Sequence, residues 1–293
     1  MDEQDKLNTE VNDEHRRHWE GQGYLLLPQV LSPADTAQLL DRVDALLESC
    51  DKKQLFSQQT AAGSGGAPDE DLRTFKIASA INQTDALDSL IDHQSTFPWL
   101  LALIGPYLQI LGTEVFVRLP GPGTEPLVEW HTDGGPALSR FLPSAGNPVL
   151  QMKVQFFLTD LSEFDKGNFM LVPGSHRRHF PDREFSFASP PAGAVQLRAR
   201  AGDALLFPWS LWHAVAPNRS NCARKSITFR YGPTWSRPYD YERLPPEVLA
   251  RMTSRRRRLC GDLGEGAHPS SFFYPDPAEQ LRLMSDDEGA APR

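Results

Sequence analysis

Apolar positions in the first third of the chain recur with the spacing of amphipathic helices. Ser32 and Pro33 have the side chains of a helix N-cap and a first helical position. The apolar stripe that follows them comprises Leu39, Leu40, Val43, Leu46 and Leu47. Other predicted helices cover 12–21, 85–92 and 98–108, and a short predicted strand covers 24–27. Residues 1–112 are therefore expected to be mostly helical.

The pattern changes after residue 112 to short β-rich runs separated by glycine and proline. These runs are 114–119, 127–131, 150–159, 169–172, 194–198, 204–207 and 225–231. Many short strands with turn signals between them indicate a sandwich, jelly roll or barrel. We therefore predict a single domain over 1–293 that is mainly β with peripheral helices. Its β core covers 113–235, and a helix at 246–257 and an acidic tail lie within 236–293.

Composition and charge narrow the classes of protein. The chain has 293 residues, is 40% hydrophobic and carries a formal net charge of −8, which argues against a general nucleic-acid binder. Its three cysteines are far apart, which suggests neither a disulfide framework nor a zinc cluster. The N-terminus lacks the order of a signal peptide, and no apolar run has membrane-spanning length. We expect a soluble, cytoplasmic protein that binds neither nucleic acid nor a membrane.

Two segments carry alternatives that the sequence leaves open. The glycine-rich stretch 61–68 is either a lid over a site or a plain connection. The arginine run 255–258 is either a site for an anionic partner or localisation factor, or a solvated face near the end of a helix.

The residues with the clearest chemistry lie in the β region. His131 and Asp133 end a predicted strand and, if that strand continues, share one of its faces, so an imidazole and a carboxylate converge. A His-x-Asp by itself is weak evidence. His213, about eighty residues later, either completes a two-histidine, one-carboxylate metal site with open positions or is a core histidine bonded to a backbone carbonyl.

A cation further along favours the metal site. Arg224 lies eleven residues after His213 at the start of a predicted strand, and an arginine fork suits the distal carboxylate of a metal-chelating dicarboxylate. Ser226 shares the strand face of Arg224 and could donate a hydroxyl to the same carboxylate. Arg219 and Arg230 are competitors that we expect to be surface or core-edge charges.

Together these motifs resemble the phytanoyl-CoA dioxygenase family. The resemblance runs over roughly 14–231 and rests on the run 23–28 before the Ser-Pro helix, His131-Thr132-Asp133, the segment 172–176, Gly202-Asp203, His213 and the segment 217–224. It implies a double-stranded β-helix, a cupin-like jelly-roll barrel with helices outside it. It also implies that His131, Asp133 and His213 hold Fe(II), and that Arg224 binds the distal carboxylate of 2-oxoglutarate.

The implied activity is oxidation of a small organic molecule by O2, with release of succinate and CO2. Lys76, fifty-five residues before His131, is a further candidate contact for 2-oxoglutarate. Val215 departs from the family pattern, because several relatives carry a serine there. Halogenating members of the wider superfamily replace the metal-binding carboxylate with a small residue, so the presence of Asp133 favours hydroxylation or another oxidation over chlorination.

Candidate substrate contacts are Arg118, Trp130, Lys153, Gln155 and Trp212. Their cations suggest a substrate with a carboxylate or other acidic group. Each side chain has a plain alternative, since the aromatic residues could be core and the strand polar residues could face outward. Two rival functions stay open: a hydroxylase of a protein side chain, and a jelly roll that binds a small molecule through a metal without catalysis.

Overall fold

The computed structural model describes residues 11–49, 74–122, 127–133, 135–138, 141, 149–181, 185–264 and 268–276. The helices of this part are α2 (Asp13–Gln22), α3 (Pro33–Ser49), α5 (Ala80–Gln83), η1 (Asp85–Leu90), α6 (Phe97–Leu103), α7 (Gly135–Leu138), η2 (Ser175–Arg177), α8 (Pro246–Ala250), α9 (Ser254–Leu259) and η3 (Pro269–Phe272). The strands are β1 (Leu25–Leu27), β2 (Thr74–Ala78), β3 (Leu108–Arg118), β4 (Val128–His131), β5 (Met152–Phe157), β6 (Phe169–Leu171), β7 (Val195–Gln196), β8 (Ala204–Pro208), β9 (His213–Val215) and β10 (Arg224–Pro233).

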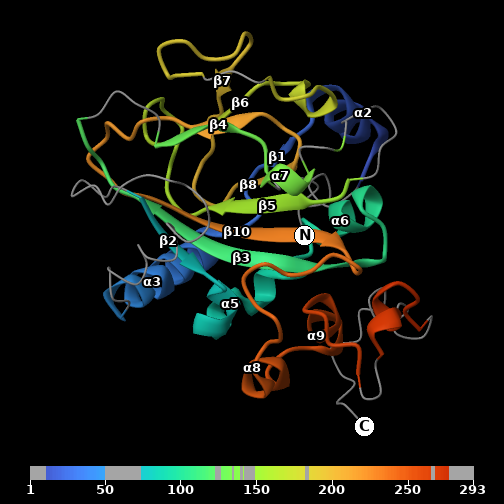
Figure 1. The fold of residues 1–293 in the computed structure, drawn as a ribbon. Helices are drawn as coiled ribbons and strands as arrows, with labels where there is room; N and C mark the ends of the chain where they lie inside the picture. The colour runs from blue at the N-terminus through green and yellow to red at the C-terminus, as the bar shows by residue number, and fades with distance from the viewer. Residues whose placement is uncertain are drawn as a thin grey trace.

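The strands form two antiparallel sheets that face each other (Figure 1). The larger sheet has the order β1-β8-β5-β10-β3-β2, and the smaller has the order β4-β9-β6-β7. Helices α3 and α5 lie on the outer side of the larger sheet, away from the smaller one (Figure 1). This arrangement agrees with the predicted jelly roll, although the hydrogen bonds between the described strands leave two separate sheets and do not close a barrel.

Period-two alternation along β10 and β3 separates the core from the space between the sheets. The apolar side chains Val115, Ile227 and Phe229 point outward into the main hydrophobic core, where they join Val43 of α3 and Trp99 of α6. Most of the intervening positions carry polar or charged side chains, Glu114 and Arg118 on β3 and Arg224, Ser226, Thr228 and Arg230 on β10. These polar positions therefore point at the smaller sheet.

The smaller sheet also has two different faces. Phe169 of β6 packs with Phe207 and Leu205 of β8 in a cluster between the sheets. Trp130 and Trp212 pack with Met170 and Phe185 in another cluster. Each tryptophan directly precedes a histidine of the inner face, so alternation places this second cluster on the outer face.

The helix and strand boundaries correct several sequence predictions. The Ser32 cap is confirmed, since its hydroxyl accepts the Asp35 N–H at 3.1 Å. The helix predicted over 98–108 ends at Leu103, and β3 already begins at Leu108. Strand β2 was not predicted. The helix predicted over 246–257 is two helices, because Thr253 caps a new one through its side chain.

The arginine run 255–258 is part of the fold. Arg256 Nε lies 2.7 Å from Asp92 Oδ1, and Arg255 Nη1 lies 3.5 Å from Asp92 Oδ2. Arg257 pairs with Asp262 at 2.6 Å, and Arg258 is 1% exposed. Neither expectation for this run, an anionic partner or a solvated face, is therefore supported. Arg255 and Arg256 tie α9 to the segment after η1, and Arg257 pairs with Asp262 just beyond α9.

Two other expectations concern a membrane span and the glycine-rich stretch. The described part of the chain has no helix that is both long enough and apolar enough to span a membrane. The glycine-rich stretch 61–68 lies outside the described residues, as does most of the acidic tail.

The Gly202-Asp203 pair anchors the segment after β1. Gly202 accepts the Leu31 N–H at 2.9 Å and donates its own N–H to Phe157 O at 2.8 Å. Asp203 accepts the N–H groups of Gln29 and Arg200 with its two oxygens, at 2.9 and 2.7 Å. Gly202 has a φ of +92°, and a Cβ there would lie 2.6 Å from Leu31 O. Both the backbone conformation and the close approach require glycine.

We expect Gly202→Ala to lower the free energy of unfolding by about 2–4 kcal/mol, because left-handed strain and a backbone clash add. Gly193→Ala is the matched control, since Gly193 also has a positive φ, +81°, but nothing lies within 4 Å of its Cβ position. It should cost only about 1 kcal/mol. Urea unfolding of both variants measures the difference, and equal losses would show that the clash contributes nothing.

Candidate metal centre and its cavity

Two histidines meet as cross-strand neighbours in the smaller sheet. His131 of β4 pairs in register with His213 of β9, and their ring centroids are 4.2 Å apart. Asp133 follows β4 and is fixed by its N–H, which donates to Trp209 O at 2.8 Å. Its carboxylate lies 3.7 Å from His213 Nε2 and 4.0 Å from His131 Nε2. One possible ligand atom from each of the three residues lies within 4.8 Å of the others.

Backbone carbonyls fix the tautomer of both imidazoles. His131 Nδ1 lies 2.7 Å from Glu129 O, and His213 Nδ1 lies 2.8 Å from Leu211 O. A carbonyl only accepts, so Nδ1 carries the proton and Nε2 presents its lone pair. Burial lowers the pKa of both histidines, that of His213 well below its usual range, which keeps the rings neutral. Neutral imidazoles are the form that binds a metal ion.

The two oxygens of Asp133 have different surroundings. Lys153 Nζ lies 2.6 Å from Oδ1, and Arg230 Nη1 lies 3.6 Å from the same oxygen. Oδ2 is buried and has no hydrogen-bond partner among the described residues. Although burial alone would raise it, the charges of Lys153 and Arg230 hold the pKa of Asp133 well below its usual range. A metal ion beside Oδ2 and the two Nε2 atoms would satisfy the orphaned oxygen, so the three residues fit a metal.

A second buried carboxylate extends this charge network. Glu114 is fully buried on β3, and Arg230 contacts its Oε2 through Nε and Nη2 at 3.2 and 3.1 Å. Lys76 forms an ion pair with the other oxygen of Glu114. Ion pairs thus connect Lys76, Glu114, Arg230, Asp133 and Lys153 in a continuous series.

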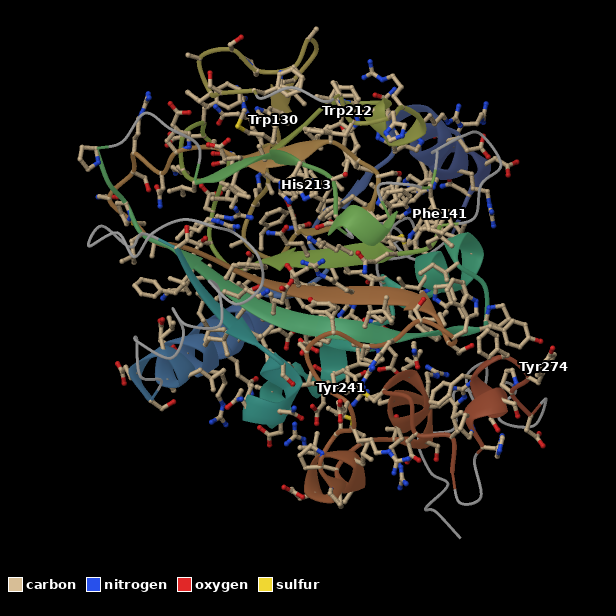
Figure 2. All side chains as sticks on the ribbon, in the orientation of Figure 1. Trp130, Phe141, Trp212, His213, Tyr241 and Tyr274 are labelled. Atoms are coloured by element: carbon tan, nitrogen blue, oxygen red, sulfur yellow. The ribbon has the colours of Figure 1, made fainter. Side chains whose placement is uncertain are left out.

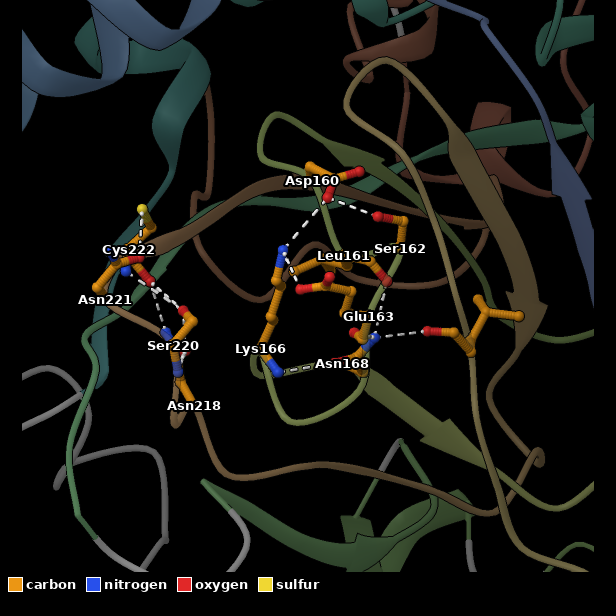
Figure 3. A network of polar contacts seen from close by, with 11 residues as sticks. Asp160, Leu161, Ser162, Glu163, Lys166, Asn168, Asn218, Ser220, Asn221 and Cys222 are labelled. Carbon is orange, nitrogen blue, oxygen red and sulfur yellow. Dashed lines mark hydrogen bonds and ion pairs between the residues drawn. The ribbon is translucent and has the colours of Figure 1, made fainter.

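Two asparagines, Asn168 and Asn218, hold two loops in place through side-chain hydrogen bonds (Figure 3). Asn168 donates its side-chain amide to the carbonyls of Leu161, Glu163 and Leu197, at 2.9, 3.0 and 3.0 Å. Asn218 donates to Arg118 O at 3.1 Å and to Cys222 O at 2.9 Å. Between these loops, Gly167 O accepts a hydrogen bond from Arg224 Nη1 at 2.8 Å. The backbone on both sides of Arg224 is therefore held in place.

The metal-binding candidates open onto a cavity of about 710 Å³. Of the predicted site residues, His131, Asp133, His213 and Arg224 line it. So do Lys76, Arg118, Lys153 and Gln155. The structure therefore brings eight of the eleven predicted residues together in one cavity.

The other three predicted residues do not line this cavity. Trp130 and Trp212 lie on the outer side of the smaller sheet, away from His213 (Figure 2). Ser226 is fully buried and accepts a hydrogen bond from Gln155 Nε2 at 3.0 Å.

Among the charged cavity residues that sequence reasoning missed are Arg230 and Glu114. Arg230 was expected at the surface or core edge, but its side chain is 16% exposed and lines the cavity. Glu114 was not considered. Strand alternation could have indicated both residues. Arg230 is on the same face of β10 as Arg224, and Glu114 is on the same face of β3 as Arg118.

Comparison with known proteins gives the class of this fold and site. The family model of phytanoyl-CoA dioxygenase (PhyH) matches residues 19–226. The chain belongs to this family of dioxygenases, as its motifs indicated.

Named relatives are similarly described as dioxygenases. Dioxygenase sphC of Aspergillus fumigatus is 23% identical over 299 residues, which cover 95% of this chain and 76% of the relative. Dioxygenase cdmA of Talaromyces verruculosus is 27% identical over 62% of this chain and 61% of the relative.

Solved structures confirm the jelly-roll fold. HygX from Streptomyces hygroscopicus, solved with nickel and 2-oxoglutarate, has a TM-score of 0.61 at 17% identity and covers 82% of this chain and 94% of its own. The non-heme alpha-ketoglutarate-dependent carbocyclase SnoK from nogalamycin biosynthesis has a TM-score of 0.58 at 22% identity. The match covers 78% of this chain and 86% of SnoK. At these identities the likeness shows the shared fold.

The buried position of Glu114 predicts a pH-dependent contribution to stability. Burial acts to raise its pKa, but Arg230 and Lys76 lower it from 4.5 to about 2. The pKa of Glu114 is lower in the folded state than in the unfolded state. The stabilisation by its ion pairs is therefore fully present above pH 4.5 and is lost as the pH falls towards 2. We expect Glu114→Gln to cost about 3 kcal/mol near neutral pH and progressively less in acid.

Urea unfolding of both proteins at a series of pH values measures this difference. Glu163→Gln is the control, because Glu163 also pairs with a lysine, Lys166, but its side chain is 77% exposed. It should change stability little at any pH. A Glu114→Gln penalty that stayed constant into acid would show that the ion pairs are not its source.

Proposed function

We propose that the protein is an Fe(II)- and 2-oxoglutarate-dependent dioxygenase that hydroxylates a small organic molecule. Membership of the PhyH family supports the reaction class. One observation carries the proposal for this chain: two neutral imidazole Nε2 atoms and the orphaned Oδ2 of Asp133 converge on one point. Two histidines and one carboxylate leave open positions on iron for a chelating keto acid and O2.

We assign His131, Asp133 and His213 as the metal ligands. Bound iron would supply oxygen activation, with 2-oxoglutarate as the reductant that is converted to succinate and CO2. One oxygen atom of O2 then enters succinate and the other enters the substrate. The protein's contribution is placement and exclusion of water. Phe169 stacks on the His213 ring at 5.2 Å and Phe207 packs on it at 5.1 Å, so this ring has little freedom to turn.

We assign Arg224 to the distal carboxylate of 2-oxoglutarate. Its guanidinium lines the cavity, is 1% exposed and would neutralise a charge that cannot be hydrated there. Lys76 remains a candidate contact, because an ammonium has three donors and Glu114 is its one ion-pair partner among the described residues. Ser226 is a weaker candidate, since its hydroxyl is engaged by Gln155.

The substrate we propose is a small molecule that carries a carboxylate or other acidic group. Five cationic and three acidic side chains line the cavity, an excess of positive charge. Fe(II) and the dianion 2-oxoglutarate cancel each other, so the excess persists after both bind. Lys153 and Gln155 are candidate substrate contacts on the cavity wall, and Arg118 is a candidate contact for either the substrate or 2-oxoglutarate. Among structural neighbours, HygX has been solved with hygromycin B, and SnoN with nogalamycin RO.

The setting we propose is reducing and cytoplasmic. Cys222 and Cys260 are both free thiols, which supports this setting.

The first test is the iron–keto acid chelate. Under anaerobic conditions, Fe(II) and 2-oxoglutarate added to the wild type should give the weak visible absorption band of the chelate. Asp133→Ala should abolish the band, because a ligand is lost. Arg224→Ala should require about ten- to a hundredfold more 2-oxoglutarate, as expected for one lost charged hydrogen-bonding partner.

Asp160→Ala is the matched control for Asp133, since its carboxylate also pairs with a lysine but lies at the surface. Its band should equal that of the wild type. Succinate release with a panel of organic acids then identifies the substrate. If iron binds and no band forms, the co-substrate assignment fails and a non-catalytic metal-dependent binding protein becomes the better description. Succinate release that needs a protein substrate would instead support the side-chain hydroxylase.

A further inference from the structure

Two buried arginines stand side by side at one end of the cavity. Arg118 of β3 and Arg224 of β10 are register partners on adjacent strands. Both line the cavity, and they are 5% and 1% exposed. An arginine side chain stays protonated in a protein, so this pair brings two like charges into a site with little water.

Neither guanidinium has a carboxylate partner in the described part of the chain. Arg224 uses Nη1 for Gly167 O, while its Nε and Nη2 have no hydrogen-bond acceptor there. Arg118 Nε is likewise buried without an acceptor. The faces of Phe116 and Phe157 lie 4.9 and 5.7 Å from the two guanidinium carbons, which stabilises the cations only in part. Unpaired buried donors of this kind are costly unless a ligand satisfies them.

Two described positions that could have supplied a hydroxyl to an anion bound by Arg224 do not supply one to the cavity. Val215 lines the cavity and is apolar, so the position two residues after His213 cannot donate a hydrogen bond. The Ser226 hydroxyl accepts from Gln155 and does not line the cavity. Arg118 therefore stands where a second polar contact to an Arg224-bound carboxylate is missing.

We propose that Arg118 and Arg224 together bind the distal carboxylate of the co-substrate, as a clamp of two guanidinium groups. This inference rests on the proposed 2-oxoglutarate dependence. Two positive charges facing one carboxylate replace the more usual pairing of one cation with one hydroxyl. The clamp selects a 2-oxo acid with a second carboxylate over one with an apolar end.

The backbone holds both arms of the clamp before any ligand binds. The Asn218 side chain donates to the carbonyl of Arg118 itself, at 3.1 Å. Gly167 has a φ of +73°, and a Cβ there would lie 3.3 Å from Arg224 Cδ, so only glycine lets this turn close on the arginine stem. Fixed donors lose little entropy when the carboxylate arrives.

The test compares two ligands on protein loaded with Ni(II), which binds without turnover. 2-Oxoglutarate is compared with 2-oxopentanoate, a 2-oxo acid of equal chain length that ends in a methyl group. Calorimetry on Arg118→Met should show 2-oxoglutarate bound about ten- to a hundredfold more weakly, as for one lost charged partner, with 2-oxopentanoate unchanged. Arg118→Lys should lose less, because it keeps the charge but not the fork.

Arg178→Met is the matched control, since Arg178 also lies over an aromatic ring, that of Trp212 at 4.6 Å, but outside the cavity. It should bind both acids like the wild type. The melting temperature without ligand gives a second readout. Arg118→Met should raise it, because one of two repelling buried charges is gone, whereas a purely structural role would lower it.

The outcomes separate the two proposals. If the wild type prefers 2-oxoglutarate and Arg118→Met retains the full preference, the clamp is wrong and Arg118 serves another group. If the wild type itself does not distinguish the two acids, the proposed co-substrate fails first. A double variant, Arg118→Met with Arg224→Met, should lose less than the sum of the single losses, because both side chains bind one carboxylate.

Discussion

The ion pair between Lys153 and Asp133 joins the two sheets across the cavity. Lys153 belongs to β5 of the larger sheet, and Asp133 follows β4 of the smaller one. A buried carboxylate without a partner would be strongly destabilising, so Asp133, the candidate metal ligand, depends on a cation from the opposite sheet. The pair also decides which oxygen stays available, because Oδ1 is taken and Oδ2 is left beside the imidazoles. Arg230 contacts both Asp133 and Glu114, so its positive charge also compensates the buried charge of Glu114.

Strand β10 serves both core and cavity through alternation of its side chains. Arg230 reaches into the cavity, while the next residue, Tyr231, donates its hydroxyl to Ile91 O at 2.7 Å in the core. The register of β10 against β3 shifts between these two residues, because β3 has the additional residue Leu111 there. Arg230 is opposite Gly112, where a Cβ would collide with the Tyr239 ring. That ring lies 4.9 Å from the Arg230 guanidinium carbon and covers it. Glycine at 112 leaves room for the ring that covers the Arg230 guanidinium, which lies between Glu114 and Asp133.

The sequence indicated the metal-binding candidates and Arg224 because they stand in a recognisable order and spacing. Strand parity was a further signal that was only partly used. Alternation places Lys153 and Gln155 on one face of β5, as predicted. It also places Trp130 and Trp212 on the face opposite the adjacent histidines, which argues against their predicted role and agrees with the structure. The hydrogen bond between Gln155 and Ser226 could not be predicted, because it depends on register between strands distant in the chain. Strand β2 is short, and its pairing with β3 is equally non-local.

The two ends of the cavity differ in how their charges are balanced. Around Asp133, the cations Lys153 and Arg230 alternate with the acids Asp133 and Glu114, so the side-chain charges of this end compensate one another. At Arg118 and Arg224, two cations adjoin with no carboxylate partner among the described residues. Such an imbalance destabilises the free protein, and a bound ligand of opposite charge removes the destabilisation. Binding at a strained site therefore releases more free energy than binding at a relaxed one. The end at Asp133 therefore suits a metal cation, because the free oxygen Oδ2 and two neutral imidazoles meet there. The end at Arg118 and Arg224 is where a bound anion contributes most to the stability of the folded state.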